Sequence, residues 1–136
     1  MNLLIVDDER EIREMLARHF SFLGHAVRTA ENGREAFDLM SQAKTDIVIS
    51  DIRMPELDGA ELCRRIRRDY PTTRVIVITG QVTLDNAMTC LRQGADACLF
   101  KPIEDLGELE EAVERSAATI TRWKAVLAKL ASGKRE

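Results

Sequence analysis

Polar and charged residues follow four of the apolar runs in this chain, at the point where each run ends. They are three carboxylates, a hydroxyl and an ammonium: Asp7, Asp8, Asp51, Thr79 and Lys101. Carboxylates packed together repel one another unless a cation joins them, and an all-oxygen site suits a hard ion such as Mg²⁺. Such an ion also neutralises an incoming phosphoryl group, so that one carboxylate can act as a nucleophile. An ammonium and a hydroxyl can hold phosphate oxygens, and the whole set predicts phosphoryl transfer.

These side chains meet only if the apolar runs are parallel strands of one sheet. The runs predict strands near residues 2–6, 26–29, 46–50, 75–79 and 96–100. Helical periodicity between them predicts helices near 9–22, 33–42, 58–69 and 84–93, and a fifth that begins near 106. Alternating strands and helices imply a parallel sheet with right-handed crossovers. The carboxyl ends of its strands then share one edge, where open α/β sheets bind ligands.

Four of the predicted helices begin with Asp or Asn followed three residues later by Glu, a pattern that resembles a capping box. The four segments are Asp8–Glu11, Asn32–Glu35, Asp58–Glu61 and Asp105–Glu108. Gly24 and Gly94 follow the first and fourth helices, where a left-handed residue commonly ends a helix. These signals place the helix boundaries independently of the apolar pattern.

The composition is that of one soluble globular domain: 136 residues, 45% hydrophobic and 32% charged, with a net charge of −3. This charge does not favour nucleic acid or an anionic membrane surface, and the apolar runs are far too short to span a membrane. An arginine run on the third helix lacks interleaved aromatics and favours a solvated face. The three cysteines show no metal-ligand spacing, which is typical of core residues in a reducing compartment. Without a charged leader before the first strand, we expect a cytoplasmic protein.

The motifs at the strand ends resemble a known family. Val6-Asp7-Asp8-Glu9, Asp51-Ile52-Arg53-Met54-Pro55 with Asp58-Gly59, Thr79-Gly80 and Lys101-Pro102 are similar in type, order and spacing to the receiver domain of two-component response regulators, of which chemotaxis receivers are examples. The resemblance covers residues 1–118. It implies a flavodoxin-like fold, a doubly wound sheet of five parallel strands with flanking helices.

The resemblance also implies a role for each residue of the acidic edge. Asp51 is expected to accept a phosphoryl group from a sensor histidine kinase or a phosphotransfer protein, and Thr79 and Lys101 are expected to bind the new phosphate. The implied Mg²⁺ ligands are Asp7, Asp8, Asp51 and the backbone carbonyl of Arg53. The chain would be a switch and not an enzyme in its own right, with only self-catalysed phosphotransfer and autodephosphorylation.

The chain departs from the family at Cys98, three residues before the lysine, where receivers commonly carry Tyr or Phe. A cysteine cannot report the state of the pocket by a large ring rotation. Phe100 points to the same side of its strand but lies closer to the pocket. We therefore expect the signal to leave by another route, through the last helix.

That last helix is longer than the sheet can cover. Its apolar pattern continues in one heptad register to about Leu130. We therefore expect the second half to project and to need a partner for four apolar residues, Ile120, Trp123, Leu127 and Leu130. Residues 119–136 are therefore predicted to extend the receiver, either as a two-stranded coiled coil in a homodimer or as a linker to an output domain.

Two other functions fit parts of the sequence. One is a dimerisation scaffold that works independently of phosphorylation, which the unusual Cys98 keeps open. The other is a Mg²⁺-dependent aspartyl phosphohydrolase. Enzymes of the haloacid dehalogenase type use Asp-x-Asp, in which the second carboxylate is a general acid, but the matching position here is Arg53.

Overall fold

In a computed structural model the chain forms a five-stranded parallel sheet flanked by helices, with strand order β2-β1-β3-β4-β5. The structure describes residues 1–51, 59–80, 83–101 and 105–133. The strands are β1 (Asn2–Val6), β2 (Ala26–Ala30), β3 (Ile47–Asp51), β4 (Arg74–Thr79) and β5 (Ala97–Phe100). The helices are α1 (Arg10–Phe22), α2 (Gly33–Gln42), α3 (Gly59–Asp69), α4 (Leu84–Arg92) and α5 (Gly107–Ala131). Each boundary lies within one residue of its prediction where both are defined.

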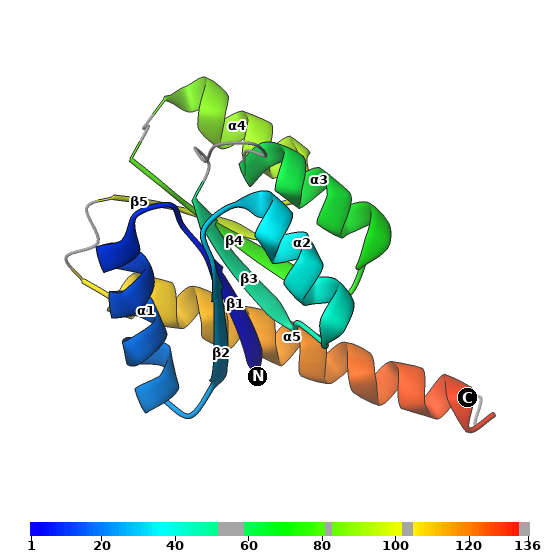
Figure 1. Ribbon diagram of the computed structural model, residues 1–136. Coiled ribbons are helices and arrows are strands. Elements are labelled where there is room, and N and C mark those ends of the chain that lie inside the picture. The colour runs from blue at the N-terminus through cyan, green and yellow to red at the C-terminus, as the bar shows by residue number, and fades with distance from the viewer. Residues whose placement is uncertain (52–58, 81–82, 102–104, 134–136) are drawn as a thin grey trace.

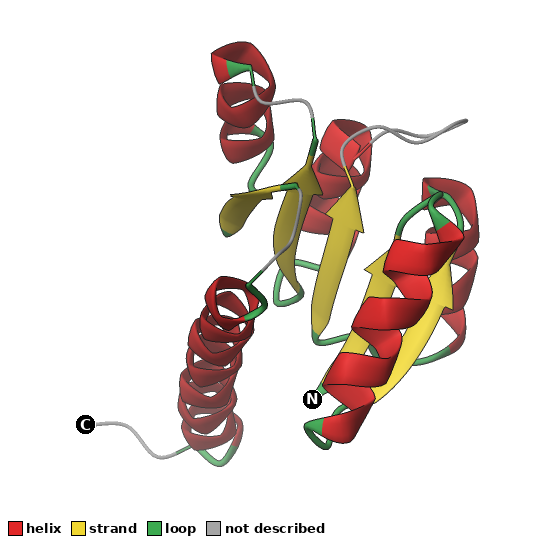
Figure 2. Ribbon diagram, turned by 90° about the vertical axis from the view of Figure 1, so that its left-hand side faces the viewer, coloured by secondary structure: helices red, strands yellow, loops and turns green. Residues whose placement is uncertain are grey.

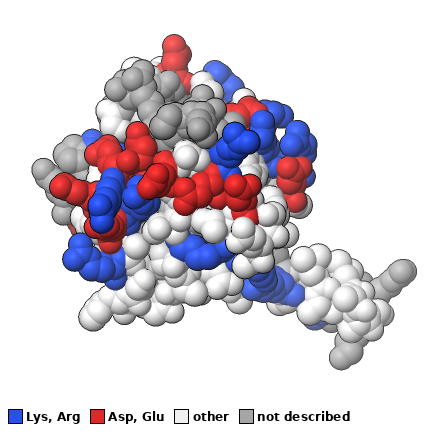
Figure 3. All heavy atoms as spheres, viewed as in Figure 1, with Lys and Arg blue, Asp and Glu red and all other residues white. Residues whose placement is uncertain are grey.

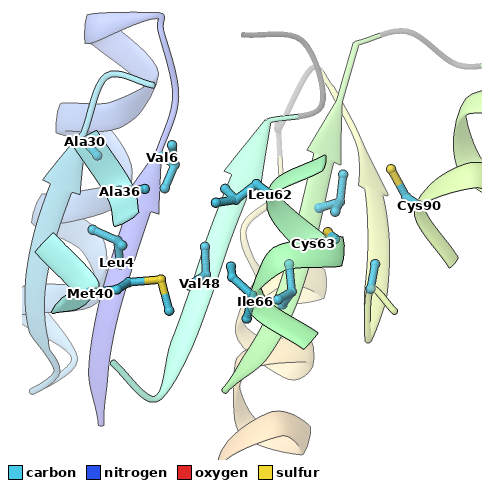
Figure 4. Packing of buried hydrophobic residues seen from close by; sticks show 13 residues of the cluster. Leu4, Val6, Ala30, Ala36, Met40, Val48, Leu62, Cys63, Ile66 and Cys90 are labelled. Carbon is cyan, nitrogen blue, oxygen red and sulfur yellow. The ribbon is translucent and has the colours of Figure 1, made fainter. Parts of the chain in front are cut away.

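Helices cover both faces of the sheet, which confirms the predicted doubly wound architecture (Figures 1 and 2). On one face, α1 and α5 pack over a core that includes Leu3, Ile5, Phe20 and Ile76. On the other, α2, α3 and α4 pack over Leu4, Val48, Leu62 and their neighbours, shown in Figure 4. Successive residues of a strand point to opposite faces, so the unbroken apolar runs of the central strands supply both cores.

The helix ends follow the capping prediction only in part. Asn32 is the N-cap of α2, and its side chain accepts a hydrogen bond from the Glu35 N–H, as expected. The prediction is wrong for α1, whose N-cap is Glu9 and has no side-chain cap bond. It is also displaced at α5, where Asp105 lies one residue before the N-cap and accepts from the Gly107 N–H at 2.8 Å. Asp58 lies outside the described residues.

Both glycines predicted to end helices have the expected left-handed backbone. Gly24 has φ 96° and Gly94 has φ 100°. At Gly94 a side chain is disfavoured for two reasons: the left-handed backbone strains a residue that has a Cβ, and a Cβ there would collide with the Arg67 side chain. The turn from α4 into β5 therefore requires glycine.

The last helix leaves the body of the domain partway along its length. Its buried residues end at Ile120, and Trp123 is half-buried, with the Arg74 guanidinium 4.3 Å from its ring centre. From Lys124 onward every described residue of the chain is exposed, and the end of α5 projects from the sheet (Figure 1). The predicted projection is confirmed from Lys124 onward. It is wrong for Ile120 and Trp123, which were expected to need an outside partner, because Ile120 is buried in the core and Trp123 packs against Arg74 of the same domain.

Candidate functional site

The sheet brings the predicted site residues to one edge. β1 and β3 are neighbours, with Val6 paired to Ser50, so Asp7 and Asp51 each lie one position further along adjacent strands. β4 and β5 pair Thr79 with Phe100, which places Lys101 one position beyond Thr79. The Lys101 N–H also donates to the Thr79 carbonyl at 2.8 Å, so the two strand ends are joined directly.

The Lys101 ammonium lies among three carboxylates. Its Nζ is 2.8 Å from Asp51 Oδ2, 3.2 Å from Asp7 Oδ2 and 3.1 Å from Glu9 Oε1. The lysine side chain is only 11% exposed, and the Asp51 side chain 8%. Burial lowers the pKa of Lys101, but hydrogen bonds to Asp51 and Glu9 and the charge of Asp7 outweigh it, so the pKa lies above its usual range. Lys101 is therefore a fixed positive charge.

Asp7 presents one carboxylate oxygen to the pocket. Its Oδ1 accepts a hydrogen bond from the Glu9 N–H at 2.8 Å, and its Oδ2 faces Lys101. Burial raises the pKa of Asp7, and this outweighs the hydrogen bond from Glu9 and the charge of Lys101, so the pKa of the carboxyl lies above its usual value. Additional positive charge in the pocket would favour the ionised form.

The pocket has the donor set of a hard cation. Asp7, Asp8, Glu9 and Asp51 can each offer a carboxylate oxygen within 4.8 Å of the others. An all-oxygen set of this kind fits Mg²⁺, which takes one or two carboxylates and completes its shell with water or phosphate oxygens. Asp8 and Glu9 are exposed and Asp7 and Asp51 are buried, so the set opens toward solvent on one side. Arg53, whose carbonyl was predicted as a ligand, lies outside the described residues.

Two residues of the site were not predicted from the sequence. Glu9 contacts Lys101, and the only available signal was its position beside the Asp7-Asp8 pair. Arg13 donates from Nη1 to the Asp7 backbone carbonyl at 2.8 Å. Its signal was a charged residue three positions before the buried Leu16, on the inner side of α1.

The remaining predicted residues lie around the pocket as follows. Thr79 ends β4 and is fully buried. Cys98 is half-buried and packs against the core beneath α3 and α4, and burial raises the pKa of its thiol. Phe100 is 47% exposed. The aromatic ring on β5 therefore lies at the surface beside the pocket.

The arginine run on α3 is mostly exposed and paired, as predicted for a solvated face. Arg64 and Arg65 lie 2.6 and 3.2 Å from the same Glu61 carboxylate, and Arg68 lies 2.9 Å from Asp69. Red and blue side chains lie interspersed in this region of Figure 3. Arg67 is the exception, since it is half-buried and lies 3.7 Å from Asp96. None of the helices in the described part of the chain combines the length and hydropathy that a membrane span needs.

A doubly wound sheet with strand order 2-1-3-4-5 and an aspartate–lysine pocket at its carboxyl edge defines a flavodoxin-like domain with its site where this fold binds ligands. The family model of the response regulator receiver domain matches residues 3–114, and the chain belongs to this family.

Individual proteins agree with this assignment. The chain is 38% identical over 122 residues to response regulator MprA of Mycolicibacterium vanbaalenii, a match that covers 90% of this chain and 51% of that protein. It thus spans about half the length of the curated relatives it matches.

Solved structures show the same fold. The signal receiver domain of an HD domain-containing protein from Pseudomonas fluorescens superposes with a TM-score of 0.85 at 29% identity, covering 89% of this chain and 97% of that one. The response regulator TrrA from Thermotoga maritima, in complex with Mg²⁺ and BeF, gives 0.76 at 32% identity, covering 85% and 97%.

Proposed function

We propose that this chain is a phospho-accepting receiver of a two-component phosphorelay. Asp51 takes a phosphoryl group from a sensor histidine kinase or a phosphotransfer protein, and its phosphorylation switches the partner or dimer interactions of the domain. The observation that carries the proposal is the contact of 2.8 Å between Asp51 Oδ2 and Lys101 Nζ in a pocket of four carboxylates. The similarity to TrrA, solved with Mg²⁺ and BeF, supports a magnesium-dependent reaction.

Asp51 is the acceptor because it ends the buried strand β3 at the centre of the pocket. One of its carboxylate oxygens forms a bond to phosphorus as the N–P bond of the donor breaks, and the donor nitrogen keeps the electron pair. Asp7, Asp8 and Asp51 would hold Mg²⁺, together with the Arg53 carbonyl. When bound, the ion supplies positive charge that neutralises the phosphoryl oxygens.

Lys101 and Thr79 are the groups that read the phosphate. The ammonium already contacts Asp51, so it can follow the charge from the carboxylate to a phosphoryl oxygen without leaving the pocket. The Thr79 hydroxyl is expected to donate to another phosphoryl oxygen. The hydrogen bond between the Lys101 N–H and the Thr79 carbonyl links the movements of the two.

The chain is expected to act as a cytoplasmic switch without turnover of an external substrate and without direct contact to nucleic acid or membrane. Its acyl phosphate would be lost by autodephosphorylation. The projecting end of α5 exposes Val126, Leu127 and Leu130 by 53–63%, and this stripe fits either a helix of a second copy or a connection to an output domain.

The test is phosphorylation of the purified chain by acetyl phosphate with Mg²⁺, followed by intact-mass measurement. We expect one phosphoryl group on the wild type, none without Mg²⁺ and none on Asp51→Asn. Asp38→Asn, an exposed residue of α2, is the matched control and should be modified normally. Full incorporation by Asp51→Asn would refute the proposal.

The same samples separate the alternative functions. Sustained hydrolysis of an added phosphoester would favour the phosphohydrolase. Equal oligomeric state in analytical ultracentrifugation with and without a phosphate mimic would favour the phosphorylation-independent scaffold.

A further inference from the structure

Arg13 is a charged residue on the inner side of α1, with a side chain only 11% exposed. Its guanidinium is shared between two segments that follow neighbouring strands. Nη1 donates to the backbone carbonyl of Asp7 at 2.8 Å, and Nη2 lies 3.6 Å from Glu31 Oε1, just after β2. Because a guanidinium is planar and carries several donors in fixed directions, it can hold both groups at once.

With this contact, the Asp7 residue is held at three of its polar groups. Its N–H donates to the Ala30 carbonyl at 3.1 Å, its carbonyl accepts from Arg13, and its Oδ1 accepts from the Glu9 N–H. The remaining oxygen, Oδ2, is the one that faces the pocket and Lys101. The backbone contacts fix the direction of the Cα–Cβ bond, and the Glu9 contact fixes the rotation of the carboxylate.

We propose that Arg13 is a positioning residue for the divalent-cation site: by holding the Asp7 carbonyl, it aims Asp7 Oδ2 at the ion. This inference rests on the proposed Mg²⁺ site. Arg13 does not touch the ion in this role, and it acts only through Asp7. Hydrogen-bond partners that orient metal ligands typically change affinity about 10- to 100-fold when they are removed.

The charge of Arg13 and its positioning contact have opposite effects on Mg²⁺ affinity, so a binding measurement can distinguish them. A positive charge near a cation site repels the cation, so loss of that charge alone strengthens Mg²⁺ binding. Loss of the positioning contact weakens it. Arg10 is a suitable control because it is an arginine of the same helix whose side chain is 80% exposed and pairs with Glu14.

The experiment is calorimetric titration of the full chain with Mg²⁺ for the wild type, Arg13→Met, Arg13→Lys and Arg10→Met. Circular dichroism in EDTA checks that each variant is folded. We expect the Kd of Arg13→Met to rise about 10-fold, that of Arg10→Met to stay equal or fall, and that of Arg13→Lys to lie between the wild type and Arg13→Met. The ammonium of Arg13→Lys keeps the charge but cannot hold Asp7 and Glu31 together.

An unchanged or lower Kd for Arg13→Met overturns the inference and leaves the metal site intact. Failure of the wild type to bind Mg²⁺ overturns the proposed site and the inference with it. If Arg13→Met does not fold, the Kd of Arg13→Lys is compared with that of a matching Arg10→Lys variant. Equal Kd values for those two variants overturn the inference, and a higher Kd for Arg13→Lys supports it.

Discussion

Replacement of Lys101 by methionine removes the positive charge from the acidic pocket while keeping an apolar stem of similar length. In the structure this charge serves Asp51, Asp7 and Glu9 together, at 2.8, 3.2 and 3.1 Å. Asp7 and Asp51 are buried, whereas the Glu9 side chain is 59% exposed and can turn to water. Lys101→Met therefore leaves two buried carboxylates without their nearest cation.

The size of the effect follows from that burial. Removing one partner of a buried ion pair costs about 3–5 kcal/mol. The pocket opens to solvent on the side of Asp8 and Glu9, so the lower end applies, and we expect the free energy of unfolding to fall by about 3 kcal/mol in EDTA. For a chain of this size, that loss corresponds to a drop in Tm of roughly 10 °C.

Magnesium should reverse much of this loss. An ion bound to the carboxylates replaces the missing charge, so the difference between wild type and Lys101→Met should shrink with Mg²⁺ concentration. Urea unfolding followed by circular dichroism, in EDTA and in Mg²⁺, measures both quantities. A loss below about 1 kcal/mol in EDTA, or the same loss with and without Mg²⁺, would refute the idea that Lys101 is the balancing cation of this pocket.

Three further outcomes are expected. The pKa of Asp7 is higher in the folded than in the unfolded state, so ionisation of Asp7 lowers the stability of the fold as pH rises through the folded-state pKa. Asp7→Asn should therefore raise the Tm in EDTA at pH 7 and lose this advantage at acid pH. A Tm difference between wild type and Asp7→Asn that does not change with pH would contradict this prediction. Burial raises the pKa of Cys63 to about 12. Alkylation of Cys63 in the folded protein at pH 8, mapped by mass spectrometry, should therefore be roughly 1,000-fold slower than in urea. Labelling of Cys63 as fast as that of half-buried Cys98 would contradict this prediction. Trp123→Ala should lower the free energy of unfolding, measured by urea unfolding, by about 0.5–2 kcal/mol because the contact of Trp123 with Arg74 is lost. Val126→Ala, a change at an exposed residue of the same helix, should alter it little. Equal losses in the two variants would contradict a stabilising contact between Trp123 and Arg74.

The positions of the elements could be predicted because polar residues or turn signals bound each apolar run. The start of β4 shows where this reasoning fails. The apolar run begins at Val75, but the strand begins at Arg74, a residue only 8% exposed. Its guanidinium is bound by Asp96 at 2.7 Å and lies over Trp123, and neither partner is near it in sequence. From the sequence alone, a charged residue such as Arg74 is placed outside the strand, because the distant residues that bind its charge in the interior cannot be identified.

The site divides along the same line. Asp7, Asp51 and Lys101 could be brought together from the sequence because a parallel sheet aligns its strand ends. The contacts of Glu9 and Arg13 could not be predicted from the sequence because they depend on the exact course of the turn after β1. The capping pattern assigned Asp8 to the start of α1, but Asp7 is the residue that accepts the Glu9 N–H. Arg13 could have been found only by asking why a charged residue lies on the inner side of that helix.

Two groups of exposed apolar residues relate differently to the pocket, and a further pair, Phe22 and Leu23 at the end of α1, belongs to neither group. The first group lies on α4 and at the end of β5: Leu84, Met88, Leu91 and Phe100. The second lies on the projecting end of α5: Val126, Leu127 and Leu130. Phe100 pairs with Thr79 and precedes Lys101, so a movement of either of these two residues, which we propose bind the phosphate, would act directly on Phe100 in the first group.

The second group is separated from the pocket by the length of the sheet. It is also held to the opposite edge, where Trp123 lies over Arg74 and Lys124 Nζ lies 3.8 Å from Asp46 Oδ1, near the amino ends of β4 and β3. Three half-exposed side chains over little more than one helical turn bury far less than the roughly 1,200 Å² of a stable interface. A dimer that used α5 alone would therefore be weak and insensitive to phosphorylation. We expect the phosphorylation-dependent contact to involve α4 and β5, with the end of α5 setting the orientation of what it joins.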